Sequence, residues 1–577
     1  MKRILYPSFF IMLCLGLVSC VHGQETREIS KENTPKASIS KTLKENEHLP
    51  VSERIDLYLT LKREKPDAYN FENEDELTMY GYGLLWNNQP EEATAIFKLI
   101  VSQFPNSSNP YDSLGEGYLA LGNTDLALEN YQKSLALNPN NFNAEDQIEH
   151  IKFPNKKILT PAEKFSKVYT IQEYKDDLDE LGNKLLTIHP NALKFITKDA
   201  FWEAIEKQKQ SLTPQTTYAD FYWMCNQIIA NVNCSHTSTG GFFEEWQMMP
   251  QDKVFPLHIN WINNKLYVID NTGNNSKVSL GDEIITINGR DVFPLVQEIF
   301  NYIPSQGHIE TYKKYTFNTW ATAMIPYHLK FPNEYTITLK GTASPITLNP
   351  VPKAQLTFNE PFTRPCPEML CLEYPSEKTA IITISSFNYY PWNNLEVFTN
   401  FIDTSFKDIE AKGVSNLIID VRYNGGGSAE SSIHLLKYLI NKPFVYFIDP
   451  ENPNAAQTYK PIASGFKGQL YFLIDGQGNS TTGHFMAMVK EHKLGTIIGE
   501  ELGSNQLCTG GQTVCRLSRT KIQYYVANTT SQVKVTTGDD SRGIFPDYEV
   551  SQPIEAILNN TDTVKEFALN IIQKNLK

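Results

Sequence analysis

The sequence predicts a multidomain protein of the α + α/β class, with helical repeats first, then a helical cap, a β-rich domain and a C-terminal α/β core. Three observations predict this class. Residues near the N-terminus recur at a fixed period, an apolar strand in the middle ends in Asn288-Gly289, and the last third alternates apolar strands with helical segments. At 577 residues, the chain is also too long for one ordinary domain.

Composition narrows the function classes. The chain is 41% hydrophobic and 20% charged, which is typical of globular domains with large cores. Its net charge is −13, and no Lys/Arg cluster stands out after the N-terminus. A nucleic-acid binder usually carries a basic stripe, so we expect no nucleic-acid partner.

Residues 1–23 have the pattern of an export signal, since two basic residues precede an apolar run from Ile4 to Leu17. Residues 17–20 resemble a bacterial lipobox, which predicts lipidation of Cys20 and a periplasmic or outer-membrane lipoprotein in the cell envelope. Cleavage after residues 21–23 and simple secretion is the alternative, and an uncleaved anchor is the third reading. Lipid is the only membrane anchor expected, because no later apolar run approaches the roughly 20 residues of a membrane span.

Residues 24–50 are polar and predict a tether, and residues 51–155 predict a tetratricopeptide region. Four positions recur 34 residues later, which is the tetratricopeptide period: Gly81, Ala93, Phe97 and Pro105 return as Gly115, Ala127, Tyr131 and Pro139. Capping helices are expected before Leu77 and after Phe142. Such repeats bind peptides or act as spacers, and we favour a docking or spacer role.

Residues 165–245 predict the helical cap. Apolar residues follow a helical period from Ile171 to Thr187, and a more buried helix is expected from Thr217 to Ala230. The second helix leads directly into the segment Cys234-Ser235-His236-Thr237.

Residues 250–345 predict the β-rich domain. The apolar strand from Ile284 to Ile287 ends in an Asn-Gly turn, which is a strong hairpin signal. The run Gly281 to Gly289 resembles a segment of PDZ domains, which hold peptide C-termini by strand addition. The resemblance implies a PDZ-like fold and leaves peptide binding open.

Residues 370–577 predict a buried, largely parallel sheet, because continuous apolar strands alternate with helices. Six cysteines outside the signal form three local pairs, either disulfides or buried free thiols, without any zinc-site spacing: Cys225/Cys234, Cys366/Cys371 and Cys508/Cys515. Expected strands are 380–384, 417–421, 444–448, 470–474 and 496–498, and expected helices include 431–439 and 485–491.

Three segments are candidates for chemistry. The first runs from Asp420 to Gly427 after a strand, where consecutive glycines let backbone N–H groups approach a ligand. In the second, Ser480 opens a helix just past a strand, so it is either a nucleophile or a helix N-cap. In the third, His236 is either a general base or a structural histidine.

Together these segments resemble the tail-specific (C-terminal processing) protease family. That family carries Asp-x-Arg-x-Asn-x-Gly-Gly, a Ser opening a helix, Ile-Gly-Glu, and a late Gly-x-x-Pro-Asp. The same motifs occur here in the same order, at residues 420–427, Ser480, 498–500 and 543–547. The resemblance covers residue 165 to the C-terminus and implies a crotonase/Clp-like α/β peptidase core with no metal or organic cofactor.

The resemblance also implies the roles of the site residues. The turn of the Ser–Lys branch lacks its Lys here, at residues 499–505, whereas Ser235-His236-Thr237 matches the tricorn-like Ser/His branch. His236 is then the base for Ser480, assisted by Ser235, with Asp540 as the acid and Asp539 as the fallback. The oxyanion hole is then formed by the backbone N–H group of Thr481 together with that of Gly426 or Gly427.

The function implied is an exported serine endopeptidase that acts on envelope proteins or peptides, with a possible protein partner at the repeats. Two departures from the family pattern leave open the alternative of a catalytically weak peptide-binding scaffold: Gly483 replaces a common Glu, and Cys234-Ser235 replaces Asp-Gly. A small-molecule hydrolase with the same triad is the third reading.

Overall fold

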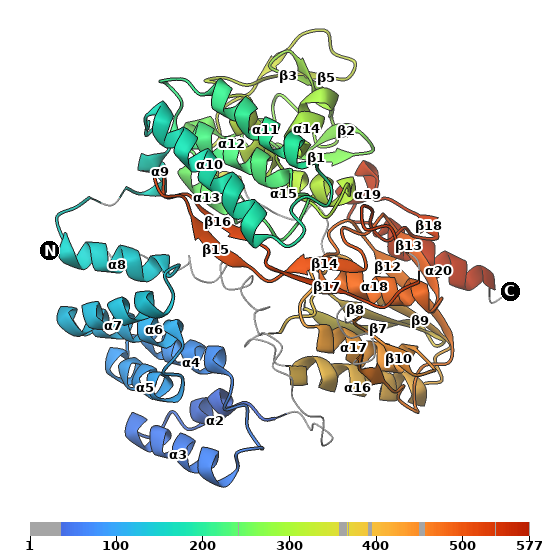
Figure 1. Cartoon of the computed structure of the whole chain (residues 1–577). Coiled ribbons are helices and arrows are strands. Elements are labelled where there is room, and N and C mark those ends of the chain that lie inside the picture. Colours follow the sequence, from blue (N-terminus) through green and yellow to red (C-terminus); the bar gives the residue numbers. More distant parts are fainter. Residues whose placement is uncertain are drawn as a thin grey trace. The chain divides into compact units, whose positions relative to one another are not determined.

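The computed structural model describes residues 36–157, 159–240, 242–356, 366, 368–389, 395–448, 456–536 and 538–575. The described residues form two compact units: residues 36–157 with 388–389 and 395–397, and residues 159–387 with 398–575 (Figure 1). The predicted signal sequence and Cys20 lie outside the described residues. Among the helices that the structure describes, none combines the length and apolarity of a membrane span.

The first unit is a stack of helices that pack in sequence order. Its helices are α2 (Ile39–Glu45), α3 (Val51–Glu64), α4 (Glu74–Trp86), α5 (Pro90–Gln103), α6 (Ser108–Ala120), α7 (Thr124–Leu137) and α8 (Phe142–Lys152). A Cβ atom at Gly81 would lie 2.4 Å from the Phe97 ring, and one at Gly115 would lie 2.8 Å from the Tyr131 ring. The recurring glycines are therefore required because the recurring aromatic rings fill the space beside them.

The second unit begins with the helical cap, whose helices are α9 (Pro161–Lys164), α10 (Ile171–Ile188), α11 (Lys198–Ser211), α12 (Tyr218–Ala230) and α13 (Phe243–Met248). A hairpin from the far end of the chain, β15 (Thr513–Arg516) and β16 (Gln523–Val526), shares the hydrophobic core of this cap. Figure 1 shows that hairpin reaching alongside the cap helices. It thereby ties the segment that follows α12 to the C-terminal core.

An antiparallel sheet follows the cap, and its strands are β1 (His258–Ile262), β2 (Lys265–Asp270), β3 (Glu283–Ile287), β4 (Arg290–Asp291), β5 (Thr336–Leu339) and β6 (Ile346–Thr347). The predicted hairpin is confirmed, since β3 and β4 pair across Asn288 and Gly289, both of which have positive φ. The 3₁₀ turns Gln251–Lys253 and Lys353–Gln355 flank the sheet, and the helices α14 (Val292–Phe300) and α15 (Glu310–His328) pack on it.

The C-terminal sheet has the order β18-β13-β12-β9-β8-β7. Neighbours from β18 to β8 are parallel, and only the edge strand β7 is antiparallel, which confirms the largely parallel sheet. Its strands are β7 (Leu370–Ser376), β8 (Thr379–Ile384), β9 (Asn416–Asp420), β12 (Gln469–Ile474), β13 (Thr496–Gly499) and β18 (Tyr548–Glu549). The helix α20 (Thr563–Asn575) covers one face of this sheet.

The remaining elements are α16 (Leu395–Ala411), α17 (Ala429–Leu439), β10 (Phe444–Val445), β11 (Thr458–Tyr459), α18 (Thr481–Glu491), β14 (Leu507–Gly510), β17 (Thr529–Gln532) and α19 (Ile554–Leu558). The strand expected at 444–448 does not join the main sheet. Residues 444–445 pair with β11, and residues 446–448 form backbone hydrogen bonds with residues 532–534. These backbone groups are therefore already satisfied outside the main sheet.

The three predicted cysteine pairs differ in outcome. Cys366 and Cys371 form a disulfide. The other four cysteines are buried free thiols: Cys225, Cys234, Cys508 and Cys515. The Cys234 thiol donates a hydrogen bond to the Thr509 carbonyl, and Cys508 and Cys515 lie on the separate strands β14 and β15.

Candidate active site

Ser480 occupies a strained turn between β12 and α18. Its backbone has φ 54° and ψ −122°, a conformation that side chains other than glycine rarely adopt. It precedes the first residue of α18, but its hydroxyl caps no helical N–H group. The N-cap interpretation is therefore not what the structure shows, and the hydroxyl is available for other contacts.

The Gly-rich loop after β9 supports this turn from below. Asn424 is fully buried, and its carbonyl accepts hydrogen bonds from the Asn479 N–H (3.1 Å) and the Thr482 hydroxyl (2.9 Å). A Cβ atom at Gly426 would lie 2.7 Å from both the Asn479 carbonyl oxygen and the Ser480 Cβ. The loop and the nucleophile turn therefore touch backbone to backbone, which only glycine permits.

The three predicted oxyanion-hole residues meet beside Ser480, but their N–H groups differ in use. The Gly426 N–H donates to the Asn424 side chain at 2.9 Å. The Thr481 hydroxyl donates to the Gly427 carbonyl at 2.6 Å and locks the two segments together. No acceptor among the described residues takes the Gly427 or Thr481 N–H, so these two are the donors left for a ligand.

Buried charges fix the ends of the strands that carry both loops. Arg422 binds Asp420 and Asp562 through paired hydrogen bonds of 2.6–2.9 Å. Asp475, directly after β12, accepts from the Tyr423 and Gln477 N–H groups, and burial raises its pKa to about 7. These hydrogen bonds hold the loop after β9 in place and do not involve the Ser480 hydroxyl.

His236 is held in place by the C-terminal strands rather than by its own helix. The Gln512 side chain donates to the His236 carbonyl at 2.6 Å, and the Ala527 N–H donates to the Thr237 hydroxyl at 3.0 Å. Ser238 pairs with Tyr525 in an isolated antiparallel bridge. These contacts place His236 beside β14, although the two are far apart in the sequence.

The sulfur atom of Cys508 lies close to both Ser480 and His236. Cys508 Sγ is 3.7 Å from Ser480 Oγ and 4.0 Å from His236 Nε2. Among the described residues, no direct hydrogen bond joins Ser480 to His236. Sequence reasoning considered Cys508 as a disulfide partner or a buried free thiol, and nothing in its local sequence signals a position near both Ser480 and His236.

The other ring nitrogen of His236 lies near Ser235, which in turn contacts Asn479. Ser235 Oγ is 3.5 Å from His236 Nδ1 and donates to Asn479 Oδ1 at 3.0 Å. The structure therefore places Ser235 beside the His236 ring, and its assisting role stays a prediction. Asn479 was missed, and its position next to Ser480 was the one signal in the sequence.

The two candidate acids lie on a neighbouring loop with other partners. Asp540 accepts from Lys194 and from the Gln506 side chain, both at 2.6 Å. Asp539 accepts from the N–H and hydroxyl of Ser541. Within the described ranges neither carboxylate contacts the His236 ring, so the structure does not bring Asp540 together with Ser480 and His236 by direct contact.

Two further buried histidines surround this region. Burial, and then the proximity of His236, lowers the pKa of both His189 and His484 to about 4. Both rings are therefore neutral at pH 7. His236 is the histidine that lies close to the Cys508 thiol, and this thiol lies close to the Ser480 hydroxyl.

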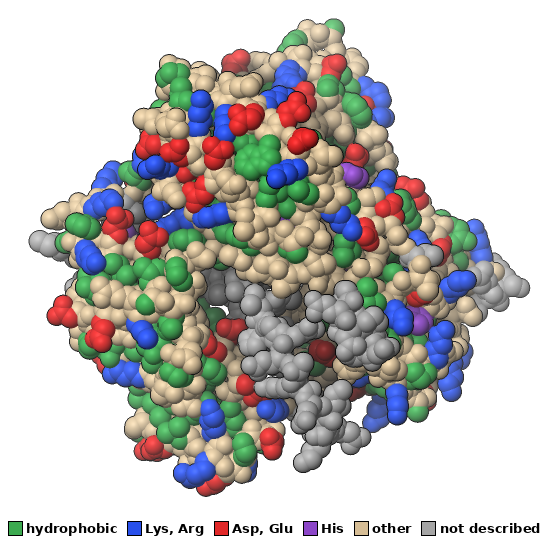
Figure 2. Space-filling view, viewed as in Figure 1, with side chains coloured by type: hydrophobic (Ala, Val, Ile, Leu, Met, Phe, Trp, Pro, Cys, Tyr) green, Lys and Arg blue, Asp and Glu red, His purple; other side chains and the backbone are tan. Residues whose placement is uncertain are grey.

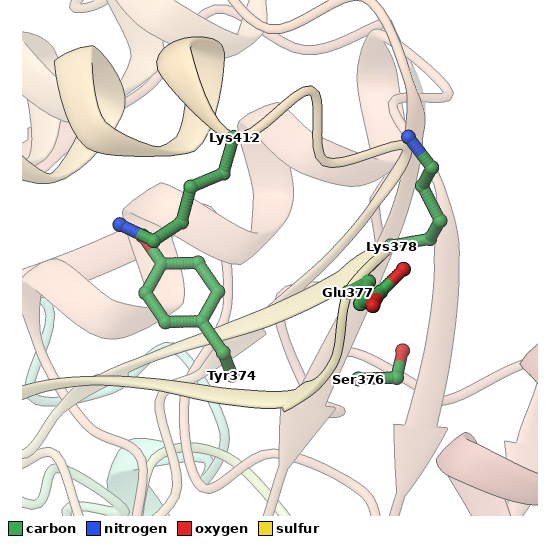
Figure 3. Close-up of a pocket in the computed structure, with 5 residues that line it drawn as sticks. All are labelled: Tyr374, Ser376, Glu377, Lys378 and Lys412. Carbon is green, nitrogen blue, oxygen red and sulfur yellow. The ribbon is translucent and has the colours of Figure 1, made fainter.

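No group of three or more His, Cys, Asp or Glu side chains in the described part of the chain is arranged to hold a metal ion. A hollow of about 560 Å³ lies elsewhere, lined by Tyr374, Ser376, Glu377, Lys378 and Lys412 (Figure 3). It opens at the turn between β7 and β8 and at the end of α16, and none of the predicted catalytic residues lines it. On the face seen in Figure 2, acidic and basic side chains are interspersed.

A serine in a strained strand–helix turn, two free N–H donors beside it and a histidine close by are the components of a serine hydrolase site. Comparison with known proteins narrows this class. A model of peptidase family S41 matches residues 378–550, and a tetratricopeptide repeat model matches residues 109–141. The chain therefore contains a region that matches peptidase family S41 and a region that matches a tetratricopeptide repeat, as the motifs predicted.

One solved structure is similar in fold. The structure of mature CPAF complexed with lactacystin is similar at a TM-score of 0.50 and 14% identity, over 70% of this chain and 98% of that chain. The photosystem II D1 C-terminal processing protease matches at 14% identity and a TM-score of 0.33, over 68% of this chain and 98% of that chain. A search of curated proteins found no match. At such identities the likeness to CPAF concerns the fold, and it confirms the predicted α + α/β class.

Proposed function

We propose that this protein is an exported serine endopeptidase that hydrolyses peptide bonds of envelope proteins or peptides, with Ser480 as nucleophile and His236 as general base. The observation that carries the proposal is the strained Ser480 turn, which packs on Gly426 and lies close to the Cys508 sulfur that also neighbours His236 Nε2. The family S41 match over residues 378–550 supports the same reaction class.

In this proposal the residues act as in other serine hydrolases. His236 Nε2 removes the Ser480 proton as the hydroxyl attacks the scissile carbonyl carbon. The oxyanion that forms binds the N–H groups of Gly427 and Thr481, and one such donor is worth about 3 kcal/mol in other proteases. His236 then protonates the leaving amine, and a water molecule hydrolyses the acyl-enzyme by the reverse sequence.

The orientation of His236 is assigned to the Ser235–Asn479 pair in this proposal. Ser235 lies beside Nδ1 and is anchored on the residue that precedes the nucleophile. Asp540 acts indirectly in this proposal, because its hydrogen bonds to Lys194 and Gln506 hold the segment that leads into β14. Its loss should therefore harm the reaction less than the loss of Ser480.

The parts outside the core suggest how substrates reach the site. We propose that the β1–β6 sheet with α14 is PDZ-like and binds a peptide terminus, on the basis of its Gly281 to Gly289 segment and its antiparallel hairpin. The helical repeats are proposed to dock a protein partner, and lipidation of Cys20 is proposed to anchor the protein in the bacterial envelope. Secretion without an anchor remains the alternative.

A peptidase assay tests the proposed pair. Ser480→Ala and His236→Ala should each lower kcat for a peptide substrate by at least about 10³-fold, since both residues take part in one proton transfer. The double variant should lose scarcely more than either single variant. Ser504→Ala, a change of the same kind at another serine, is the matched control and should keep most of the activity.

The assay also separates the alternatives. A wild-type protein that binds peptides but hydrolyses none, with folding intact, would favour the catalytically weak scaffold. Hydrolysis of small esters with no peptide turnover would favour the small-molecule hydrolase.

A further inference from the structure

We propose that the repeat unit carries a binding site for a lysine side chain of a partner protein, formed by Asp112 and Glu116 on α6 and the Tyr131 hydroxyl on α7. The inference rests on the docking role proposed for the repeats, and it adds the chemistry of the partner. All three residues lie in the stretch 109–141 that matches a tetratricopeptide repeat, within the helical stack of the first unit (Figure 1).

Two carboxylates are held together on one face of α6. Asp112 and Glu116 are four residues apart in the helix, which places them on the same face. The Asn143 amide nitrogen, in the first turn of α8, donates to Asp112 Oδ2 at 2.9 Å and to Glu116 Oε1 at 3.2 Å. The Asn141 amide nitrogen donates to Asp112 Oδ1 at 3.0 Å. Neutral amides of the next helix therefore fix both carboxylates.

Neither carboxylate has a positively charged partner. Asp112 is only 8% exposed, whereas Glu116 is part-exposed and gives a ligand access from solvent. Among the described residues, no Lys, Arg or His forms an ion pair with either of them, and the ion pairs described in this unit involve other acids. Buried carboxylates are usually paired, because an unpaired buried charge is costly. The pair on α6 therefore lacks a cation.

The hydroxyl of Tyr131 is an independent sign of an unfilled site. Its side chain is fully buried, and the hydroxyl has no hydrogen-bond partner among the described residues. A Cβ atom at Gly115 would lie 2.9 Å from Tyr131 Cζ, the ring carbon that bears the hydroxyl. That end of the ring thus meets α6 in the turn that also carries Asp112 and Glu116. After burial, the charges of these two carboxylates are the next causes that raise the pKa of Tyr131.

A protonated amine matches this set of groups. A lysine ammonium has three hydrogen-bond donors, one positive charge and no acceptor, so it can serve both carboxylates and the Tyr131 oxygen. Burial, and then the charge of Asp112, raises the pKa of Glu116 to about 7, although Tyr82 and Asn143 oppose that rise. A cation offsets both causes. Helical repeat stacks offer extended surfaces to other proteins, which favours a lysine on a protein over a free amine.

Binding of two peptides to the full-length Ser480→Ala protein tests the site. One peptide is Gly-Ser-Gly-Lys-Gly-Ser-Gly, acetylated at its N-terminus and amidated at its C-terminus, and the other carries acetyl-lysine in place of lysine. The serine variant prevents hydrolysis, and the amidated end removes the carboxylate that a PDZ-like domain would hold. In titrations observed by NMR, the lysine peptide should bind at least about tenfold more tightly than the acetylated one.

Isosteric variants in the same background locate the binding. Glu116→Gln and Asp112→Asn should each weaken binding of the lysine peptide at least about tenfold, since each removes one charge with little change of shape. Affinity for the acetyl-lysine peptide should stay as it was. Glu129→Gln is the matched control, because Glu129 is an exposed acid on α7, and it should bind as the parent does. If Asp112→Asn does not fold, Glu116→Gln decides.

The outcomes separate the inference from the proposals on which it rests. Equal affinity for the two peptides, or unchanged affinity in folded Glu116→Gln, overturns the lysine site and leaves the docking role standing. Binding of neither peptide overturns the inference and the docking role together. Spermidine that binds where the lysine peptide does not also overturns it, since the ligand is then a free amine. Fluorophosphonate labelling of the wild type decides the peptidase proposal separately.

Discussion

At the scale of single residues, the site depends on side chains whose surroundings decide what they can do. Ser480 does not cap α18 because its backbone is turned into the left-handed region, and this leaves the hydroxyl facing Cys508. The Gly426 N–H is consumed by Asn424, which shifts the oxyanion role to Gly427 and Thr481. Each assignment follows from a hydrogen-bond partner that is already taken.

Much of this was accessible from the sequence. The strand–turn–helix pattern around Ser480 and the glycines after Asp420 predicted which residues would meet, because the carboxyl ends of parallel strands lie at one edge of a sheet. Cys508 and Asn479 were not predictable in this way. Their positions near Ser480 come from side-chain directions in β14 and in the Ser480 turn, which periodicity and spacing do not encode.

A buried carboxyl group behind the His236 segment makes a residue-scale prediction about pH. Glu245 on α13 is fully buried, and burial raises its pKa from 4.5 to about 8. Its Oε1 accepts from Asn226 and Thr239, bonds that a glutamine can keep. Below pH 4.5 both folded and unfolded chains hold the proton, whereas between pH 4.5 and 8 only the unfolded chain releases it.

Wild type should therefore lose stability relative to Glu245→Gln as pH rises through that window, by up to about 1.4 kcal/mol per pH unit. Urea unfolding of both proteins at pH 5, 6, 7 and 8 measures the difference. A constant gap between the two stability curves would contradict the raised pKa.

At the scale of elements, the loop after β9 and the start of α18 act as one body. Asn424 and Gly427 each accept a hydrogen bond from the first residues of α18, and Gly426 touches the backbone of the turn. Precise placement of the nucleophile therefore depends on a contact between two loops that follow neighbouring strands.

Gly426→Ala tests that contact. Gly426 has φ +102°, and its new methyl group would meet the Asn479 carbonyl oxygen and the Ser480 Cβ at 2.7 Å. Displacing the turn by even about 1 Å should cost on the order of 10²-fold in kcat/KM. Gly425→Ala is the matched control, since a Cβ there meets nothing within 4 Å. Equal kcat/KM values for the two variants, both folded by circular dichroism, would refute the role of the contact.

At the scale of the whole molecule, segments far apart in the chain build one site. His236 precedes the β1–β6 sheet and Ser480 follows it, and the β15–β16 hairpin joins the helical cap to the core. The sequence motifs predicted the order of these parts. The packing of this hairpin against the helical cap was not predicted. Its apolar residues have the pattern of an ordinary strand, and that pattern does not indicate which helices they contact.

The chain as a whole is also predicted to be anchored through Cys20. Lipidation is the one anchor proposed, so Cys20→Ala should move the exported protein from the membrane fraction to the soluble fraction. Fractionation of cells that express either form, with immunodetection, measures this. Unchanged membrane association of the exported variant would remove the lipoprotein proposal and leave the peptidase proposal untouched.

The central claim is that Ser480 is a nucleophile activated by His236. The most direct measurement is mass spectrometry of the full-length protein after reaction with a fluorophosphonate, followed by mapping of the modified peptide. The account predicts one adduct on Ser480, formed at least about 10³-fold more slowly in His236→Ala, because removal of the base leaves the hydroxyl unactivated. An adduct on another serine, or equal labelling of Ser480 with and without His236, would contradict it.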